Sequence, residues 1–457
     1  MSKFRIFLAV LTVVASSASY IVARDGIDVG RAIVESRCSA GAFIAHSKKP
    51  SAASPDSQAD SAVTASASSG QAATTYTPVP VTSANLLPNG SLEARTGANP
   101  TGWSSNAYGN NTSNFSNVRG RDSAQGLRID ISKYSDGTAD WFGPNVKVTP
   151  GGYYQFQDYY RSSAPSRAIL QLKDDTGRLQ YVNLESVPAA SDWKLYTQRF
   201  FVPANVSEIM ISHPFDRVGW LETDDYSLVA LQAPGYERGM VSVTFDDGWR
   251  SVYNDALPLM EKYDVVSTQY LASGLLGSLD EYMTPRMAFK FKHAGHEIGS
   301  HTVDHADLTK LNDKDLSGQL VTSHKGLDKC FENVTSFAPP YGASDARTIA
   351  AVKQTYATSR STEAGFNSPD SLNPYRLKVQ NIRRDTPPAQ VAAWLRTAAE
   401  NKVWLVLVYH QVSDSPGEFS RKLVDFETDM LLLKQSDLEI LTMHNAYAKT
   451  QTNSVQQ

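Results

Sequence analysis

The stretch Val241-Ser-Val-Thr-Phe-Asp-Asp-Gly-Trp249 decides how this chain folds. Its first residues alternate valine with serine and threonine, and β-branched residues in alternation are typical of a half-buried strand. Two adjacent carboxylates, Asp246 and Asp247, follow it, and they point in different directions because successive side chains of a strand alternate. Gly248 then allows a sharp turn. The stretch predicts a strand that ends at two acidic groups, although Asp-Gly is also a common hairpin turn.

The rest of residues 236–450 alternates between strand-like and helix-like segments. The strand-like segments are 240–245, 267–272, 296–299, 336–338, 375–382, 403–409 and 438–443, and the helix-like segments are 253–263, 286–293, 316–327, 345–356, 391–398 and 423–433. Such alternation predicts a parallel sheet, and seven or more units over some 210 residues favour a (β/α) barrel. In such barrels the working residues lie where the strands end at their carboxyl side.

Histidines occur at two of these strand ends. His301 and His305 follow the segment 296–299, and a spacing of four would place both imidazoles on one face of a helical turn, within reach of one divalent ion. His410 ends the apolar segment 403–409. Taken singly, the first pair could be a solvated helix face and the last a core histidine. Between them lies a stiff loop, Phe337-Ala-Pro-Pro-Tyr-Gly342, with few backbone donors.

These four strand-end signals, in this order, resemble the polysaccharide deacetylase family (carbohydrate esterase family 4), which contains the nodulation-type chitooligosaccharide deacetylases. The resemblance covers about residues 239–448. It implies a distorted (β/α) barrel and a metal-dependent hydrolase that removes acetyl groups from a polysaccharide.

The resemblance also implies a role for each residue at the site. Asp247, His301 and His305 would bind the metal; Zn²⁺ fits this set of nitrogen and oxygen ligands, and Co²⁺, Ni²⁺ or Fe²⁺ could replace it. Asp246 would be the general base and His410 the general acid. The backbone N–H of Tyr341 would stabilise the oxyanion, because the two prolines before it have no N–H.

Two positions depart from the family's pattern. Many relatives carry an arginine just before the two prolines, where it orients the base, but this chain has Ala338. Lys378 or Arg383 could supply the missing cation. The carboxylate that tunes the acid histidine is not evident either, with Asp370 and Asp385 as candidates.

Residues 85–233 have a different character. Short alternating runs, rich in aromatic residues, are separated by Gly, Asn, Asp and Pro, and no helical period is sustained, which predicts an antiparallel β-sandwich. The segments 85–93 and 223–229 resemble the ends of jelly-roll carbohydrate-binding modules, which implies a structural Ca²⁺ near Glu93 and Asp225. Trp103, Tyr108, Trp141 or Tyr159 could stack on sugar rings, although for any one aromatic residue a place in the core is the simpler expectation.

The first 84 residues are not expected to belong to either domain. Residues 1–24 combine a basic start with an apolar run, as in a signal peptide or an uncleaved membrane anchor, with a buried helix as the alternative. Residues 25–84 are predicted to be a low-complexity linker rich in Ser, Ala, Thr and Pro. This pattern predicts a secreted or envelope-associated protein. A net charge of −4 gives no indication of a nucleic-acid partner, and two cysteines exclude a disulfide scaffold.

Three functions are consistent with the sequence. The first is an exported deacetylase that acts on an N-acetylated polysaccharide of the poly-N-acetylglucosamine, chitin or peptidoglycan type. The second is an esterase that removes O-acetyl groups from xylan with the same kind of site. The third is an inactive carbohydrate-binding matrix protein, for which the missing arginine is an argument and the complete Asp, Asp, His, His and His set a counter-argument. The oligomeric state cannot be predicted.

Overall fold

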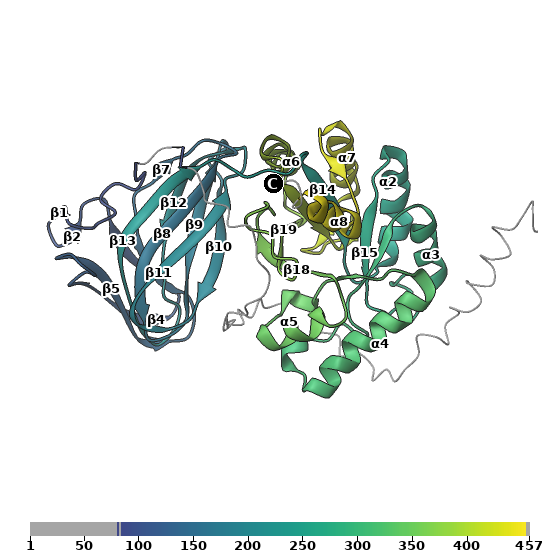
Figure 1. Ribbon diagram of the computed structural model, residues 1–457, viewed down its shortest axis with the longest axis horizontal. Helices are drawn as coiled ribbons and strands as arrows, with labels where there is room; N and C mark the ends of the chain where they lie inside the picture. Colours follow the sequence, from purple (N-terminus) through teal and green to yellow (C-terminus); the bar gives the residue numbers. More distant parts are fainter. Residues whose placement is uncertain (1–79, 82–83, 454–457) are drawn as a thin grey trace, which may run out of the picture.

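The computed structural model describes residues 80–81 and 84–453, which form a β-sandwich and a barrel that lie side by side (Figure 1). The predicted signal peptide or anchor, and nearly all of the predicted linker, lie outside the described residues and stay predictions. Within the described part, no helix has the length and apolar character needed to span a membrane.

The first domain confirms the predicted antiparallel sandwich. Its strands are β1 (Arg95–Thr96), β2 (Asn99–Pro100), β3 (Ser104–Tyr108), β4 (Asn111–Val118), β5 (Gly126–Tyr134), β6 (Thr138–Phe142), β7 (Val146–Lys147), β8 (Tyr153–Ser162), β9 (Ser166–Asp174), β10 (Leu179–Val187), β11 (Ala190–Phe201), β12 (Val206–Ser212) and β13 (Gly219–Leu231). One sheet has the order β11-β8-β13-β5-β4; the other has the order β10-β9-β12-β6-β3, with β7 paired to β12, and β1 pairs with β2.

The sandwich is held together by alternating side chains that meet between the two sheets. In β8 every second residue is buried, as expected for a strand with one face toward a core. Trp103 and Trp141 belong to this core, so they are not exposed sugar platforms. Tyr108 is exposed, and the ring of Tyr159 is covered by the guanidinium of Arg121, 4.0 Å away.

The second domain contains the alternating units. In chain order they are β14 (Met240–Phe245), the π-helical η2 (Val252–Ala256), α2 (Leu257–Tyr263), β15 (Ser267–Leu271), α3 (Pro285–His293), β16 (Glu297–Ser300), the 3₁₀ turn η3 (Leu308–Lys310), α4 (Asp313–Phe331), β17 (Ser336–Phe337), the 3₁₀ turn η4 (Pro340–Gly342), α5 (Ala346–Lys353), β18 (Thr358–Ala364), β19 (Leu377–Asn381), α6 (Pro388–Asn401), β20 (Trp404–Tyr409), β21 (Gln411–Val412), β22 (Ser420–Arg421), α7 (Leu423–Gln435), β23 (Glu439–Ile440) and α8 (Met443–Asn453).

Seven parallel strands close into the predicted barrel. Their order is β14-β15-β16-β17-β18-β19-β20, with β20 pairing back to β14 and β23 attached outside the ring to β14. In β14 and β20 the odd-numbered apolar residues, such as Val243 and Leu407, pack toward the surrounding helices, whereas Met240, Val406 and Val408 pack in a separate interior cluster. Both faces of these strands are therefore buried, which explains the nearly continuous apolar run that ends at Tyr409.

Two elements differ from the sequence-based prediction. Strand β18 (Thr358–Ala364) was not predicted, because Thr-Ser-Arg-Ser-Thr-Glu-Ala has neither a hydrophobic period nor an apolar run. Its first four residues are nevertheless buried. The segment 438–443 holds only the two-residue strand β23, and Met443 begins helix α8.

The two domains are joined by hydrogen bonds along α6 and the loop after β18. The side chain of Asn401 donates to the carbonyl of Gly151 (2.8 Å), and the Thr397 hydroxyl accepts from the backbone N–H of Ala204 (2.9 Å). At the other end, Asp370 accepts from the Tyr153 hydroxyl (2.8 Å), and Arg199 also donates to it (3.1 Å). These contacts hold the edge of the sandwich against one side of the barrel (Figure 1).

His296, at the start of β16, should make the stability of the barrel depend on pH. It is 4% exposed, and its Nδ1 accepts from the backbone N–H and hydroxyl of Ser267 (3.0 and 2.8 Å). Burial lowers the pKa of His296 to about 4, below its ordinary value, so the folded state favours the neutral ring. The resulting stability is complete above pH ~6.5 and is lost as the pH falls toward 4.

Between pH 7 and pH 5 this group should therefore remove about 2 kcal/mol of unfolding free energy. Urea unfolding at the two pH values should show that His296→Gln, which keeps an acceptor for Ser267, loses about 2 kcal/mol less than the unaltered protein. His293→Gln, at an exposed histidine nearby, is the control and should lose as much as the unaltered protein. Equal losses in all three proteins would contradict the assignment.

Candidate active site

The register between β14 and β20 brings the first pair of candidate residues together. Phe245 pairs with Tyr409, so the next residues, Asp246 and His410, are neighbours at the end of the two strands. The backbone N–H of Asp246 donates to the carbonyl of Tyr409 (3.1 Å), and Nε2 of His410 lies 3.6 Å from Oδ2 of Asp246. Asp246 is 2% exposed. A buried carboxylate and an imidazole therefore share one mouth of the barrel.

Asp247, His301 and His305 converge beside this pair. Oδ1 of Asp247 lies 3.3 Å from Nε2 of His301 and 3.2 Å from Nε2 of His305, and the three ligand atoms all lie within 4.8 Å of one another. For bonds of about 2.0–2.1 Å in a tetrahedral shell, two ligand atoms stand about 3.3 Å apart. Among the described residues this is the one cluster of three or more His, Cys, Asp or Glu that could hold a metal ion.

The hydrogen bonds around the cluster leave its lone pairs free for a cation. Nδ1 of His301 is 2.7 Å from the carbonyl of Ala338, which can only accept, so Nδ1 carries the proton and Nε2 presents its lone pair. Oδ2 of Asp247 accepts from the indole of Trp249 (2.8 Å), while its buried Oδ1 has no hydrogen-bond donor among the described residues. An orphaned buried oxygen beside two such nitrogens fits a divalent ion.

Electrostatics around Asp247 favour its charged form. Burial alone would raise the pKa of this carboxyl, but the neighbouring imidazoles of His301 and His305 hold it well below its usual range. Burial lowers the pKa of His410, although Asp246 and Asp247 act in the opposite direction.

The histidine pair is not carried by a helix, as its spacing had suggested. Residues 302–304 form a turn, and Thr302 (φ 69°) and His305 (φ 62°) have left-handed backbones. The prediction that both imidazoles reach one centre is consistent with the structure, but the predicted helical turn is wrong. A left-handed, β-branched Thr302 is strained, and such strain is concentrated at functional sites.

The proline loop lies beside His305. Tyr341 has a left-handed backbone (φ 60°), its ring centroid lies 4.6 Å from that of His305, and its side chain is 67% exposed. Its N–H donates to no backbone carbonyl in the part of the chain that the structure describes. At Gly342 (φ 66°) a Cβ would collide with the side chain of Thr362 in β18, so only glycine fits.

A residue that was not predicted, Arg360, supplies the cation missing at Ala338. Its guanidinium donates to Oδ2 of Asp246 in a pair whose side chains are 2% and 3% exposed. Phe337 pairs with Ser359 in the parallel β17–β18 ladder, so Arg360 stands level with Ala338 on the neighbouring strand. The arginine is thus supplied by the strand next to the one expected, and it still contacts the proposed base, Asp246.

The candidates named for the two open positions lie elsewhere. Arg383 pairs with Glu418, and Lys378 lines a cleft between the domains. Asp370 is bound at the domain interface, and Asp385 lies 3.6 Å from Arg178. Neither carboxylate contacts His410, whose buried Nδ1 has no hydrogen-bond partner among the described residues.

Comparison with known proteins agrees with this geometry. The family model described as polysaccharide deacetylase matches residues 234–359. The chain contains a polysaccharide deacetylase domain. The model ends at Ser359, so Arg360 and His410 of this domain lie beyond the matched residues.

Curated relatives match parts of the deacetylase domain. The putative polysaccharide deacetylase YxkH of Bacillus subtilis is 29% identical over 161 residues, 33% of this chain and 57% of the relative. The peptidoglycan-N-acetylglucosamine deacetylase PgdA of Listeria monocytogenes is 31% identical over 105 residues, 22% of each chain. This chain thus spans little more than half of the first relative and under a quarter of the second.

A solved structure resembles the chain weakly. It is the CE4 domain of a multidomain xylanase from the hindgut metagenome of Trinervitermes trinervoides, with 18% identity and a TM-score of 0.37 over 47% of this chain and 92% of that one.

The carboxylates suggested for calcium in the sandwich have protein partners. Asp225 accepts from Nε and Nη2 of Arg121 (3.1 and 2.9 Å), and Glu93 accepts from the backbone N–H of Gln125 (2.9 Å). They do not belong to a cluster of three metal-binding groups within the described residues. A structural calcium ion there stays a prediction without structural support.

Proposed function

We propose that this protein is an exported, metal-dependent hydrolase that removes N-acetyl groups from an amino-sugar polysaccharide. The observation that carries the proposal is the convergence of Asp247 Oδ1, His301 Nε2 and His305 Nε2 beside the Asp246–Arg360 pair and His410. Three protein ligands leave room for water and substrate, as in catalytic metal sites. Zn²⁺ suits two imidazoles and a carboxylate, and Co²⁺, Ni²⁺ or Fe²⁺ could substitute for it.

The bound ion would lower the pKa of a water molecule and polarise the acetyl carbonyl. Asp246 is the group positioned to accept the proton of that water, since Arg360 holds Oδ2 and leaves the buried Oδ1 without a donor. The N–H of Tyr341 would donate to the oxygen that becomes negatively charged as the carbonyl is attacked.

His410 would complete the reaction by donating a proton to the departing amine, because an amine is a poor leaving group without one. It lies next to Asp246 and not within the metal cluster, so an acid and a base stand at the same mouth. Water adds to the acetyl carbon, the C–N bond breaks, and the products are acetate and a free amino sugar.

The substrate class is supported by the printed names of the relatives, which include deacetylases of peptidoglycan N-acetylglucosamine and of chitin. The matches cover under half of those proteins, so the polymer itself belongs to the proposal. Export is supported by the N-terminal sequence pattern alone.

Acetate release distinguishes the candidate functions. The full chain is incubated with N-acetylglucosamine oligomers and with acetylated xylan, with and without a chelator. We expect acetate from the oligomers, loss of activity with the chelator, and recovery on addition of Zn²⁺. Acetate from xylan alone would favour the esterase, and none from either substrate with metal bound would favour a carbohydrate-binding protein without activity.

A further inference from the structure

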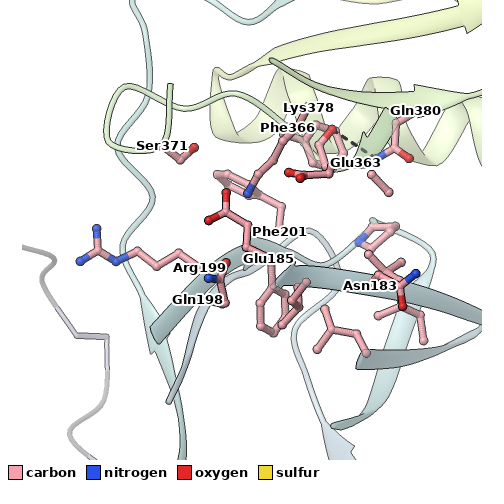
Figure 2. Close-up of a pocket in the computed structure, with 18 of the residues that line it drawn as sticks. Asn183, Glu185, Gln198, Arg199, Phe201, Glu363, Phe366, Ser371, Lys378 and Gln380 are labelled. Carbon is pink, nitrogen blue, oxygen red and sulfur yellow. Dashed lines mark hydrogen bonds between the residues drawn. The ribbon is translucent and has the colours of Figure 1, made fainter. Parts of the chain in front are cut away.

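A cleft lies between the sandwich and the barrel, outside the catalytic site. Figure 2 shows that β10 and β11 of the sandwich form one side of it and the segment around β18 and β19 the other. The cleft opens to solvent, and most of the space between its walls is continuous with the solvent outside the protein. Pockets at domain interfaces are common binding sites for ligands.

The lining of the cleft combines apolar and polar groups. Its apolar lining includes Val182 and the largely buried Phe201 and Phe366, with the two phenyl rings 5.7 Å apart. Its lining also carries side-chain amides, which can both donate and accept hydrogen bonds: Gln180, Asn183, Gln198 and the buried Gln380. A sugar ring has an apolar C–H face and a circle of hydroxyl groups, so it matches such a lining on both counts.

The charges of the cleft select a neutral ligand. Glu363 is paired with Arg376, and Arg199 is paired with Asp370. This leaves one carboxylate, Glu185 of the sandwich, and one ammonium group, Lys378 of the barrel. They point toward one another across the cleft, and neither side chain has an ion-pair or hydrogen-bond partner among the described residues (Figure 2). With one charge of each sign, the cleft should favour neither a polyanion nor a polycation.

Strand β18 connects the cleft to the catalytic site. Arg360 in this strand binds the base Asp246, Thr362 lies against Gly342 of the proline loop, and Glu363 lines the cleft. Three residues of strand span about 10 Å. A polymer that occupied both the cleft and the metal cluster would therefore follow the direction of this strand.

From these observations we propose that the interdomain cleft is a binding site for neutral sugar residues of the same N-acetylated polysaccharide, remote from the residue that is deacetylated. The proposal rests on the proposed function for the identity of the polymer. Glu185 and Lys378 would each hydrogen-bond to sugar hydroxyl or acetamido groups. The sandwich would then contribute to catalysis by holding a long chain rather than by contacting the reacting group.

The test compares a short and a long substrate, the dimer and the hexamer of N-acetylglucosamine. Glu185→Leu and Lys378→Met should each lower the ratio of kcat/KM for the hexamer to kcat/KM for the dimer by about tenfold, as expected for one lost hydrogen bond to a charged group. Glu185→Gln, which keeps the hydrogen bond and loses only the charge, should lower the ratio less. Glu261→Gln on α2 and Lys133→Met on β5, both exposed and far from the cleft in sequence, should leave this ratio unchanged. An unchanged ratio in the cleft variants overturns the proposal. If kcat/KM falls equally for both substrates and the melting temperature is lower, Glu185 and Lys378 only hold the two domains together, and the proposal is overturned as well.

Binding without turnover separates this proposal from the proposed function. Affinity electrophoresis of the full chain carrying Asp247→Asn, with and without Glu185→Leu, measures hexamer binding when no acetate is released. Weaker binding in the double variant supports the cleft even if the unaltered protein deacetylates neither oligomer. Equal binding overturns the cleft whether or not the enzyme is active.

Discussion

Asp247→Asn should lose its bound metal and lower kcat/KM for N-acetylglucosamine oligomers by about 10³-fold or more. A metal ion contributes several kcal/mol to the stabilisation of transition-state charge, and each 1.36 kcal/mol is about tenfold in rate. The amide keeps an oxygen that can accept from Trp249 (2.8 Å in the unaltered protein) but removes the negative charge that faces the two imidazoles. Asparagine also tolerates the left-handed backbone at this position (φ 73°), so the fold should be preserved.

Metal content measured by elemental analysis after dialysis, together with acetate release, tests this expectation. Asp304→Asn is the matched control, because Asp304 is exposed, directly precedes His305 and lies outside the cluster. The control should retain both metal and activity. If Asp247→Asn kept its full metal content and its rate in the presence of a chelator, the assignment of these three ligands would be wrong.

Much of the barrel could be predicted because the amino-acid composition of most of its strands identifies them as strands. The apolar run before His410 is a direct consequence of burial on both faces. The alternation before Asp246 predicted a strand correctly, but the strand is not half-buried as expected, because Ser242 and Thr244 are buried as well. Once the two strands are known to be parallel neighbours, the proximity of Asp246 and His410 follows from their places at the strand ends. The helical turn assigned to His301 and His305 failed because spacing alone does not reveal a left-handed backbone at Thr302.

Arg360 could not be predicted because its strand carries no hydrophobic signal. The buried side chains of β18 are polar, and two of them have specific partners on opposite faces of the strand: the hydroxyl of Ser361 donates to the carbonyl of Leu377 (3.0 Å), and Arg360 donates to Asp246. Burial here is compensated by hydrogen bonds and charge pairing, which a hydrophobic pattern does not record. Only an indirect signal was present in the sequence: because position 338 holds alanine and not arginine, a cation for the base had to be expected from another strand.

Arg360→Met should lower kcat/KM by about 10²-fold, at the lower end of the contribution of a positioned base. Removing one partner of a buried ion pair leaves Asp246 without its positive neighbour and costs about 3–5 kcal/mol of stability. Desolvation then favours the protonated carboxyl, so the rise of activity with pH should move to higher pH. Arg360→Lys provides a point charge without the planar fork of a guanidinium, so its kcat/KM should lie between those of Arg360→Met and the unaltered protein. Arg396→Met, at an exposed arginine on α6, should change neither rate nor pH profile.

Restoring the arginine at position 338 distinguishes a positioning role from a merely structural one. Ala338 packs in the same interior cluster as Tyr270, and the guanidinium of Arg360 lies over the Tyr270 ring, 5.8 Å from its centroid, so the two positions share one space. Arg360→Ala vacates the space of the whole side chain, so Ala338→Arg in that background should be accommodated. It should recover at least about tenfold in kcat/KM over Arg360→Ala and return the pH profile toward that of the unaltered protein. Recovery of the urea midpoint without recovery of the pH profile would mean that Arg360 only stabilises the fold. If the base works through its pairing with an arginine, the strand that supplies this arginine should not matter, because Ala338 and Arg360 stand at the same level of the ladder.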